Sequence, residues 1–217
     1  MQDVRVNDWM ELTEALYEIP RNSHGRHRSD FVYRGLSDAA WSLDTSLSRL
    51  GGNYANVEAA LLRTFRRYAE PGSIPGNSLW VTLSVAQHHG LPTRLLDWTV
   101  SPKIAVHFAT AEPEHFDRDG AVWCVDVVKA RAVLPRQLRD VLECNRAFLF
   151  SIEMLEFITD LNQFDELGQE HPFVLYFTAP VRDIERPYAA PIGVRSHQMR
   201  GAPPRPHFSL GRDGIGL

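Results

Sequence analysis

The sequence has few cysteines, few lysines and no long apolar run. Its two cysteines, Cys124 and Cys144, are too few for a disulfide framework and lack CxxC spacing, so we expect two reduced thiols. No stretch of about 18 apolar residues occurs, and residues 1–4 hold no basic region that leads into one. We therefore expect no membrane-spanning helix, no signal peptide, no membrane partner and a cytoplasmic location.

The chain also lacks a basic excess and the common enzyme signatures. Its formal net charge of -4 is unlike that of a dedicated nucleic-acid binder, and Lys103 and Lys129 are the only lysines. It contains no GxSxG elbow, phosphate-binding Walker loop, Rossmann glycine pattern, HExxH or HxxxH spacing. The sequence therefore gives no signal for those hydrolases, nucleotide-binding folds or zinc enzymes, and we expect no metal.

What is present is the composition of a globular protein with helices and strands in mixed order. Hydrophobic residues make up 44% of 217 residues and charged residues 23%, which is enough apolar material for a real core. Apolar spacing and turn residues predict helices at residues 8–19, 56–69, 78–89, 102–109, 136–143 and 152–161, and strands at 31–36, 95–99, 121–127 and 173–177. Strands that do not strictly alternate with helices indicate the α+β class.

Two of these helices come with specific expectations about their buried faces. Ser101 before Pro102 is a strong helix start, with a hydroxyl cap before a proline in the first turn. The residues expected to face the core are Val57, Leu61, Phe65 and Tyr68 in the helix at 56–69, and Ile104, Ala105, Phe108 and Ala109 in the helix at 102–109.

The first candidate site is Tyr33-Arg34-Gly35, at the end of the strand at 31–36. A guanidinium fixed at a strand end can bind a phosphate or pyrophosphate with two parallel hydrogen bonds, and a neighbouring glycine lets a ligand approach the backbone closely. The competing interpretation is structural, with Arg34 paired to a core carboxylate such as Asp97. The residues alone favour neither.

The second candidate site is the segment of residues 87–99, which gathers polar groups between two predicted helices. His88 and His89 are adjacent, so on a helix they point about 100 degrees apart and make poor joint metal ligands. Trp98 could stack on a base or nicotinamide, although burial in the core is the commoner outcome. The remaining candidates are Thr93 and Thr99 as positioning hydroxyls, Asp97 as a carboxylate, and Arg94, which could equally brace Asp97.

Both segments resemble the FRG domain family, named for its Phe-Arg-Gly motif. The matching residues are 31–35, 41–47, 86–99 and 101–109, with a weaker match at 195–198 and Gly201. The resemblance implies one FRG domain over residues 1–202, with a helical N-terminal segment at 1–30 and a core at 31–202. The chain departs from the family after Gly201, where Ala202-Pro203-Pro204 replaces the usual aromatic, and we expect residues 203–217 to form a flexible tail.

A more distant resemblance is to ADP-ribosyltransferases of the arginine-serine-glutamate type. It implies their mixed-sheet core with flanking helices, NAD as the bound substrate, Arg34 as the NAD-binding arginine, and Asp97, Trp98 and Thr99 in the place of the Ser-Thr-Ser motif. Gly35 would then bind near the nicotinamide, His88 or Asp97 would contact the ribose or move a proton, and Gln198 would orient the substrate. No Glu-x-Glu pattern stands on a late strand, and Glu185 is the one nearby acid.

The function expected from the sequence is therefore NAD binding with transfer or hydrolysis of the ADP-ribosyl group. Two alternatives stay open. One is a binding module without catalysis, which captures a nucleotide or a protein tail, and the other is a nucleic-acid-directed toxin or nuclease that uses His88, His89 and the basic loop around Arg26. A bacterial toxin or phage-defence effector would suit such a small domain, with a protein or nucleic acid as acceptor.

Overall fold

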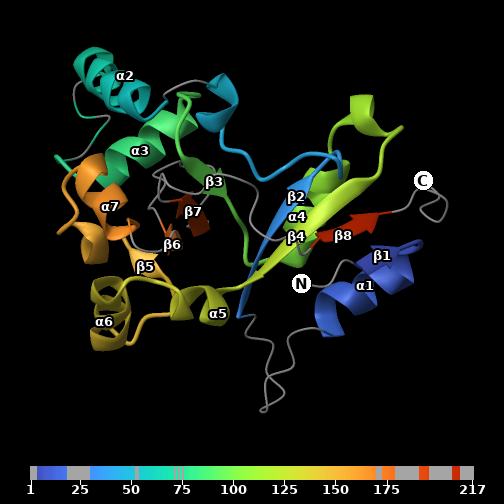
Figure 1. The fold of residues 1–217 in the computed structure, drawn as a ribbon. Helices are drawn as coiled ribbons and strands as arrows, with labels where there is room; N and C mark the ends of the chain where they lie inside the picture. Colours follow the sequence, from blue (N-terminus) through green and yellow to red (C-terminus); the bar gives the residue numbers. More distant parts are fainter. Residues whose placement is uncertain are drawn as a thin grey trace. The chain divides into compact units, whose positions relative to one another are not determined.

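A computed structural model of the chain describes residues 4–18, 30–51, 54–70, 72, 74, 76–169, 173–178, 191–195 and 207–210. The chain divides into two compact units, each built from separate segments (Figure 1). Unit 1 comprises Met1–Leu43, Trp98–Val128 and Ala202–Leu217, and unit 2 comprises Asp44–Asp97 and Lys129–Gly201. Both units are of mixed α+β structure, and the single domain expected over residues 1–202 stays a prediction.

Unit 1 is a four-stranded sheet with helices against it. The strands lie in the order β1-β8-β4-β2; β1 pairs with β8 in parallel, and the other neighbours are antiparallel. The elements are β1 (Val4–Val6), α1 (Trp9–Glu18), β2 (Phe31–Leu36), α4 (Pro102–Thr110), the 3-10 turn η2 (Pro113–His115), β4 (Gly120–Asp126) and β8 (His207–Leu210). Its core contains Val6, Leu12 and Leu16 with Tyr33 and Val122.

Helix α4 packs closely on β2 and β4 because the side chains on both sides of the contact are small (Figure 1). The buried residues of α4 are Pro102, Ala105, Val106 and Ala109. The expectation that Ile104 and Phe108 face the core was wrong, since they are 47% and 54% exposed. Alanines face the sheet instead, because bulky side chains would hold the helix away from it.

Unit 2 contains a second four-stranded sheet, in the order β3-β7-β6-β5. The β3–β7 and β7–β6 pairs are antiparallel, and β6 and β5 are parallel. The elements are η1 (Ser48–Leu50), α2 (Tyr54–Tyr68), α3 (Leu79–His88), β3 (Leu95–Asp97), α6 (Arg136–Cys144), β5 (Phe150–Ser151), η3 (Glu153–Leu155), α7 (Leu161–Leu167), β6 (Val174–Thr178) and β7 (Pro191–Arg195). Helix α5 (Val127–Ala132) spans the boundary between the units.

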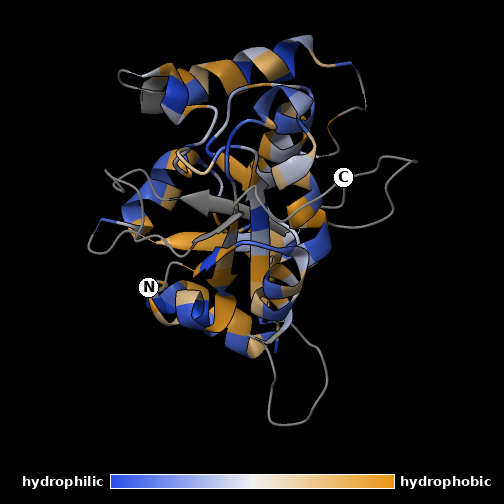
Figure 2. Ribbon diagram, turned by 90° about the vertical axis from the view of Figure 1, so that its right-hand side faces the viewer, coloured by the Kyte–Doolittle hydropathy of each residue, from blue (hydrophilic) through white to orange (hydrophobic). Residues whose placement is uncertain are grey.

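The core of unit 2 is rich in aromatic residues. Trp80 of α3 contacts Phe164 and Phe177 edge-on, with ring centroids 5.4 Å apart in both pairs. Its indole Nε1 donates to the Leu155 carbonyl at 2.9 Å, so the buried ring has its polar atom satisfied. Figure 2 shows hydrophobic and hydrophilic residues mixed along the helices, as expected where one helix face is buried.

Several predicted elements differ from those observed. The helix expected at 152–161 is the short turn η3, and the helix in this region, α7, begins only at Leu161. Asp160 caps it by accepting from the Gln163 amide at 3.0 Å, while Gln163 Oε1 accepts from the Thr159 amide at 2.9 Å. Of the tail expected from Pro203, His207–Leu210 form β8 between β1 and β4, and its other residues lie outside the described ranges.

The buried side of α2 also differs from the expected stripe. Val57 and Tyr68 are 45% and 78% exposed, whereas Glu58 and Leu62 are buried. The stripe is rotated because Glu58 has an internal partner, described below. Within the described ranges, no helix is both long enough and apolar enough to cross a membrane.

Candidate functional site

In unit 1, the candidate site lies at the carboxyl end of β2. Arg34 and Gly35 face Trp123 and Val122 of β4 in register. On the other edge, the Tyr33 amide donates to the Thr99 carbonyl at 2.7 Å, and the Thr99 amide donates to the Tyr33 carbonyl at 2.8 Å. Backbone groups of alternate residues point to the same edge of an antiparallel strand, so the N–H and C=O of Gly35 point to the edge that Thr99 occupies beside Tyr33.

Gly35 is required by packing rather than by room for a ligand on its Cα. A Cβ at this position would lie 1.8 Å from the Ala105 carbonyl oxygen and 2.7 Å from the Ala109 amide nitrogen of α4. The space that we expected to admit a ligand is therefore filled by helix backbone. What Gly35 can still offer is its backbone N–H and C=O.

Arg34 is half-buried and lies on the other face of the sheet. Adjacent strand residues point to opposite faces, so the guanidinium is directed away from the face that α4 covers. The other two unit 1 candidates have structural surroundings. Trp98 is 4% exposed, which agrees with a core indole and leaves little of its ring surface for stacking. Thr99 Oγ1 accepts from the Ser101 amide at 3.0 Å, whereas Ser101 makes no side-chain capping bond to α4.

In unit 2, a chain of hydrogen bonds joins two of the expected site residues. Thr93 Oγ1 donates to Gln87 Oε1 at 2.8 Å, and Gln87 Nε2 donates to Asp97 Oδ1 at 2.6 Å. Thr93 is completely buried and Asp97 is exposed. Gln87, in the last turn of α3, thus links the interior to a surface carboxylate at the end of β3. Because Thr93 is buried, its hydroxyl is connected to the surface through Gln87.

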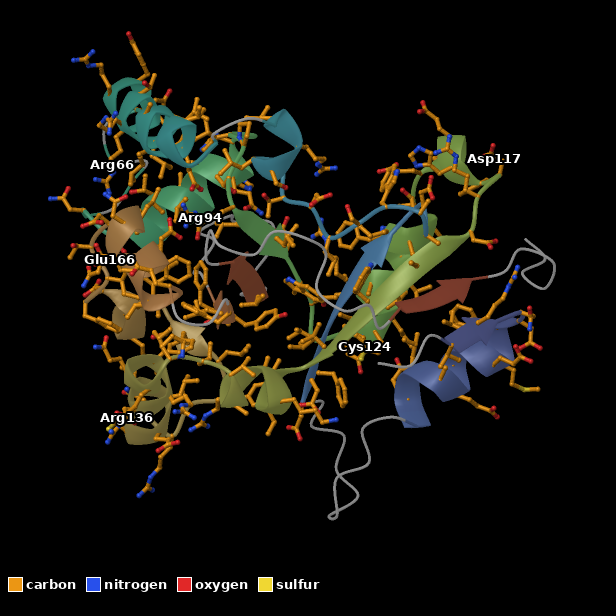
Figure 3. All side chains as sticks on the ribbon, in the orientation of Figure 1. Arg66, Arg94, Asp117, Cys124, Arg136 and Glu166 are labelled. Carbon is orange, nitrogen blue, oxygen red and sulfur yellow. The ribbon has the colours of Figure 1, made fainter. Side chains whose placement is uncertain are left out.

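Arg94 is 6% exposed and its side chain bonds to Glu58 and Asp165 instead of bracing Asp97, while the expectation that it binds a cofactor stays a prediction. Its Nε donates to Glu58 Oε2 at 2.6 Å, its amide donates to Glu58 Oε1 at 3.0 Å, and a terminal nitrogen, Nη1, donates to Asp165 Oδ1 at 2.7 Å. Burial raises the pKa of Glu58, while the Arg94 donors act in the opposite direction. Figure 3 labels Arg94 in unit 2, where it connects α2, the segment before β3, and α7.

The two adjacent histidines, His88 and His89, are exposed. The rings of His88 and His89 lie 5.5 Å apart at 76°, and His89 also lies 6.0 Å from the Phe65 ring. Among the described residues, no group of three or more His, Cys, Asp and Glu side chains is placed to hold a metal ion. Gln198, Glu185 and the loop around Arg26 lie outside the described residues.

A second polar cluster in unit 1 ties together the segments that follow β2 and α4. His115 Nδ1 lies 2.7 Å from Glu112 Oε2 and 3.0 Å from Ser37 Oγ, and Ser37 Oγ donates to Glu112 Oε2 at 3.1 Å. A serine-histidine-acid relay needs the serine and the acid on different ring nitrogens. Here both meet Nδ1, so the cluster is a tether, as expected of a structural histidine.

The sequence singles out Thr93, Arg94 and Asp97 but gives no role to the residues that bond to them. Gln87 begins the candidate segment 87–99 but is given no role there, and Glu58 and Asp165 are not among the candidates. Asp165 is 71 positions from Arg94 along the chain, so local sequence holds no signal for that pairing. A glutamate inside a helix stripe of otherwise apolar residues was the available signal for Glu58.

Comparison with known proteins gives one result. No curated protein and no solved structure matches the chain. The model of the FRG domain matches residues 29–118, a range that includes Arg34, Gln87, Thr93 and Asp97. Residues 29–118 therefore resemble an FRG domain, in agreement with the resemblance that the motifs carry.

Proposed function

We propose that this FRG domain binds NAD or a related nucleotide and transfers or hydrolyses its ADP-ribosyl group, on a mixed α+β fold like that of the ADP-ribosyltransferases. The observation that carries the proposal is the end of β2, where Arg34 is directed away from the face that α4 covers and Gly35 presents its backbone at the edge beside Thr99. A guanidinium and a free strand edge are the groups that would bind the pyrophosphate and the carboxamide of a dinucleotide.

The guanidinium of Arg34 and the backbone of Gly35 can bind different parts of one nicotinamide nucleotide. A guanidinium binds a pyrophosphate through paired, charge-assisted hydrogen bonds. A primary carboxamide has one acceptor oxygen and an NH₂ donor, so the N–H and C=O of Gly35 can bond it as they would bond a neighbouring strand. Nicotinamide bears such a group, and inorganic phosphate does not. This pairing favours a nicotinamide nucleotide over a simple phosphate ligand.

The reaction needs a carboxylate as well. Cleavage of the nicotinamide–ribose bond develops positive charge on the ribose, as glycoside hydrolysis does, and an ionised carboxylate stabilises that charge. For this role, or for contacts with the ribose, the resemblance to the ADP-ribosyltransferases suggests Asp97, with His88 as the alternative group for proton transfer. The products would be nicotinamide and either ADP-ribose, when water attacks, or an ADP-ribosylated acceptor. In both cases the attacking nucleophile loses a proton.

The test is nicotinamide release from NAD together with binding of a fluorescent etheno-NAD analogue. Arg34→Ala should weaken binding by at least about tenfold, which corresponds to the loss of a charge-assisted hydrogen bond, with little change in melting temperature. Arg63→Ala, which removes an exposed arginine of α2, is the matched control. Unchanged binding together with a large loss of stability would show that Arg34 is structural.

A binding module without catalysis is the second candidate, and one observation favours it. Thr93 is buried and Arg94 is held by Glu58 and Asp165, so two expected substrate-contacting groups are engaged internally. Saturable binding of etheno-NAD without release of nicotinamide would select this function.

A further inference from the structure

The tether of Ser37, Glu112 and His115 in unit 1 fixes which ring nitrogen of the histidine carries the proton. Glu112 Oε2 lies 2.7 Å from His115 Nδ1, and an ionised carboxylate only accepts hydrogen bonds. Ser37 Oγ donates its one proton to the same carboxylate at 3.1 Å, so toward Nδ1, at 3.0 Å, it too can only accept. The proton of the neutral ring is therefore on Nδ1, and Nε2 carries a lone pair that accepts.

This second nitrogen, Nε2, faces solvent. The contacts of His115 with other described residues are those of Nδ1 and an edge-on contact with the Trp41 ring. Nε2 is not among the buried, unbonded side-chain nitrogens of the described residues, so it reaches the surface of the protein. The histidine side chain is 20% exposed. An oriented acceptor is thus presented to a ligand from solvent.

Trp41 provides an exposed aromatic surface beside the imidazole. The two ring centroids lie 5.1 Å apart with the ring planes at 88°, and Trp41 is 39% exposed. The backbone before Trp41 is held by Asp38, whose Oδ1 accepts from the Ala40 amide at 2.8 Å and whose Oδ2 accepts from Arg118 Nη1 at 2.7 Å. The segment is therefore ordered before a ligand binds, which lowers the entropy lost on binding.

We propose that Trp41 and His115 form a subsite for adenine, in which the indole stacks on the base and Nε2 accepts from its exocyclic amino group. Glu112 and Ser37 are positioning residues that keep the proton on Nδ1. Adenine offers a planar face and an amino donor at its edge, which match an exposed indole and an acceptor nitrogen. That the adenine belongs to a dinucleotide rests on the proposed function, whereas the acceptor and the indole rest on unit 1 alone.

The subsite lies close to the backbone that we propose for the carboxamide. Ser37 stands two positions after Gly35, so their Cα atoms are at most about 7 Å apart. His115 is bonded to Ser37 and therefore lies at the same end of β2. Binding of both ends of one dinucleotide requires this proximity.

The first test is the tautomer of His115, read without a ligand from the NMR signals of the ring nitrogens at a pH where the ring is neutral. Nε2 should give the signal of an unprotonated nitrogen. Ser37→Ala combined with Glu112→Ala should increase the fraction of rings that carry the proton on Nε2, because both partners of Nδ1 are lost. His107, exposed on α4, is the internal reference. A protonated Nε2 in the wild type overturns the acceptor role, and an unchanged tautomer in the double variant overturns the positioning role.

The second test compares adenosine with purine riboside, which lacks the exocyclic amino group. The wild type should bind adenosine about tenfold more tightly, as expected for one additional hydrogen bond, and adenosine should shift the NMR signals of both Trp41 and His115. Trp41→Leu should weaken the binding of both nucleosides, because the stacking surface is lost. Etheno-adenine has no amino N–H, so etheno-NAD should bind less tightly than NAD itself.

His115→Asn is the sharpest variant because it removes Nε2 and keeps an N–H that can donate to Glu112. It should weaken adenosine about tenfold and leave the Kd of purine riboside unchanged. His107→Asn makes the same change at an exposed histidine of α4 and is the matched control. Melting temperatures of all variants are measured in parallel.

The outcomes separate the subsite from the proposed function. Equal affinity of the wild type for the two nucleosides, or equal weakening of both in His115→Asn, overturns the role of Nε2. No binding of adenosine, or binding that leaves the Trp41 and His115 signals unchanged, overturns the subsite. Release of nicotinamide from NAD in that case would show that the proposed function holds with adenine bound elsewhere. Adenosine bound at Trp41 and His115, with no binding of NAD, would show the reverse.

Discussion

The two thiols differ sharply at the scale of the single residue. Cys124 lies buried in β4, and burial raises its pKa to about 12, while Cys144 is exposed at the end of α6. The thiolate is the reactive species, so at pH 8 Cys124 holds about a thousandfold less of it than a thiol of ordinary pKa near 9. An alkylating reagent should modify one thiol in the native protein and two after unfolding. Native Cys144→Ser should then react hardly at all, and rapid modification of Cys124 would contradict its burial.

The same thiol should make stability depend on alkaline pH. In the unfolded chain it ionises near pH 9, and in the folded chain only near 12, so its contribution is complete below pH 9 and is lost as pH rises from 9 to 12. By pH 10 the loss is about 1.4 kcal/mol. Urea unfolding of the wild type and Cys124→Ala at pH 8 and pH 10 measures it. A stability difference between the two proteins that is the same at both pH values would contradict the burial of the thiol.

Single residues of the candidate site could be predicted from the sequence, but their surroundings could not. Arg34, Thr93 and Asp97 could be singled out because functional polar groups collect at the ends of elements and because their motif is specific. The burial of Thr93 and Arg94 could not be predicted from the sequence. The partners of Arg94 are Glu58 and Asp165, which are 36 and 71 positions away along the chain.

At the scale of the element, the close approach of α4 to β2 depends on glycine. Gly35→Ala would place a methyl group 1.8 Å from a backbone oxygen that cannot rotate away, whereas at Gly120 the nearest atom, the Ala109 oxygen, would be 2.9 Å away. We expect a loss of unfolding free energy of about 2–3 kcal/mol for Gly35→Ala, and a smaller loss for Gly120→Ala. Urea unfolding measures both. Equal losses would show that the contact with α4 is not what requires Gly35.

The elements themselves could largely be predicted, but their buried faces could not. The strand at 31–36 and the helices at 78–89 and 136–143 agree with β2, α3 and α6 to within a residue at each end. Their periodicity and their glycine or proline boundaries are local features. The side that faces the core depends on neighbours: alanines of α4 meet glycines of β2 and β4, and Glu58 turns α2 toward Arg94.

At the scale of the whole molecule, the chain is divided between units that local patterns do not reveal. Unit 1 joins the first strand to one near the chain's end, where Val4 pairs with Phe208 and Val6 with Leu210. β8 has four residues, and a proline precedes it, so its sequence alone is typical of a loop. It is a strand because β1 and β4 supply its hydrogen bonds. A short strand such as β8 can be recognised only from its pairing with strands that are distant in the sequence.

The Arg94 network should show where the stability of unit 2 resides. Arg94→Met leaves Glu58 buried without its cation, at a cost of about 3–5 kcal/mol near neutral pH. The cost should be smaller at pH 5, since burial raises the pKa of Glu58 and a neutral carboxyl needs no cation. Hydrogen exchange followed by mass spectrometry should show faster exchange in α2, β3 and α7. Arg94→Met with Glu58→Leu should recover much of the loss, because the uncompensated charge is gone, and unchanged exchange in the single variant would refute the network.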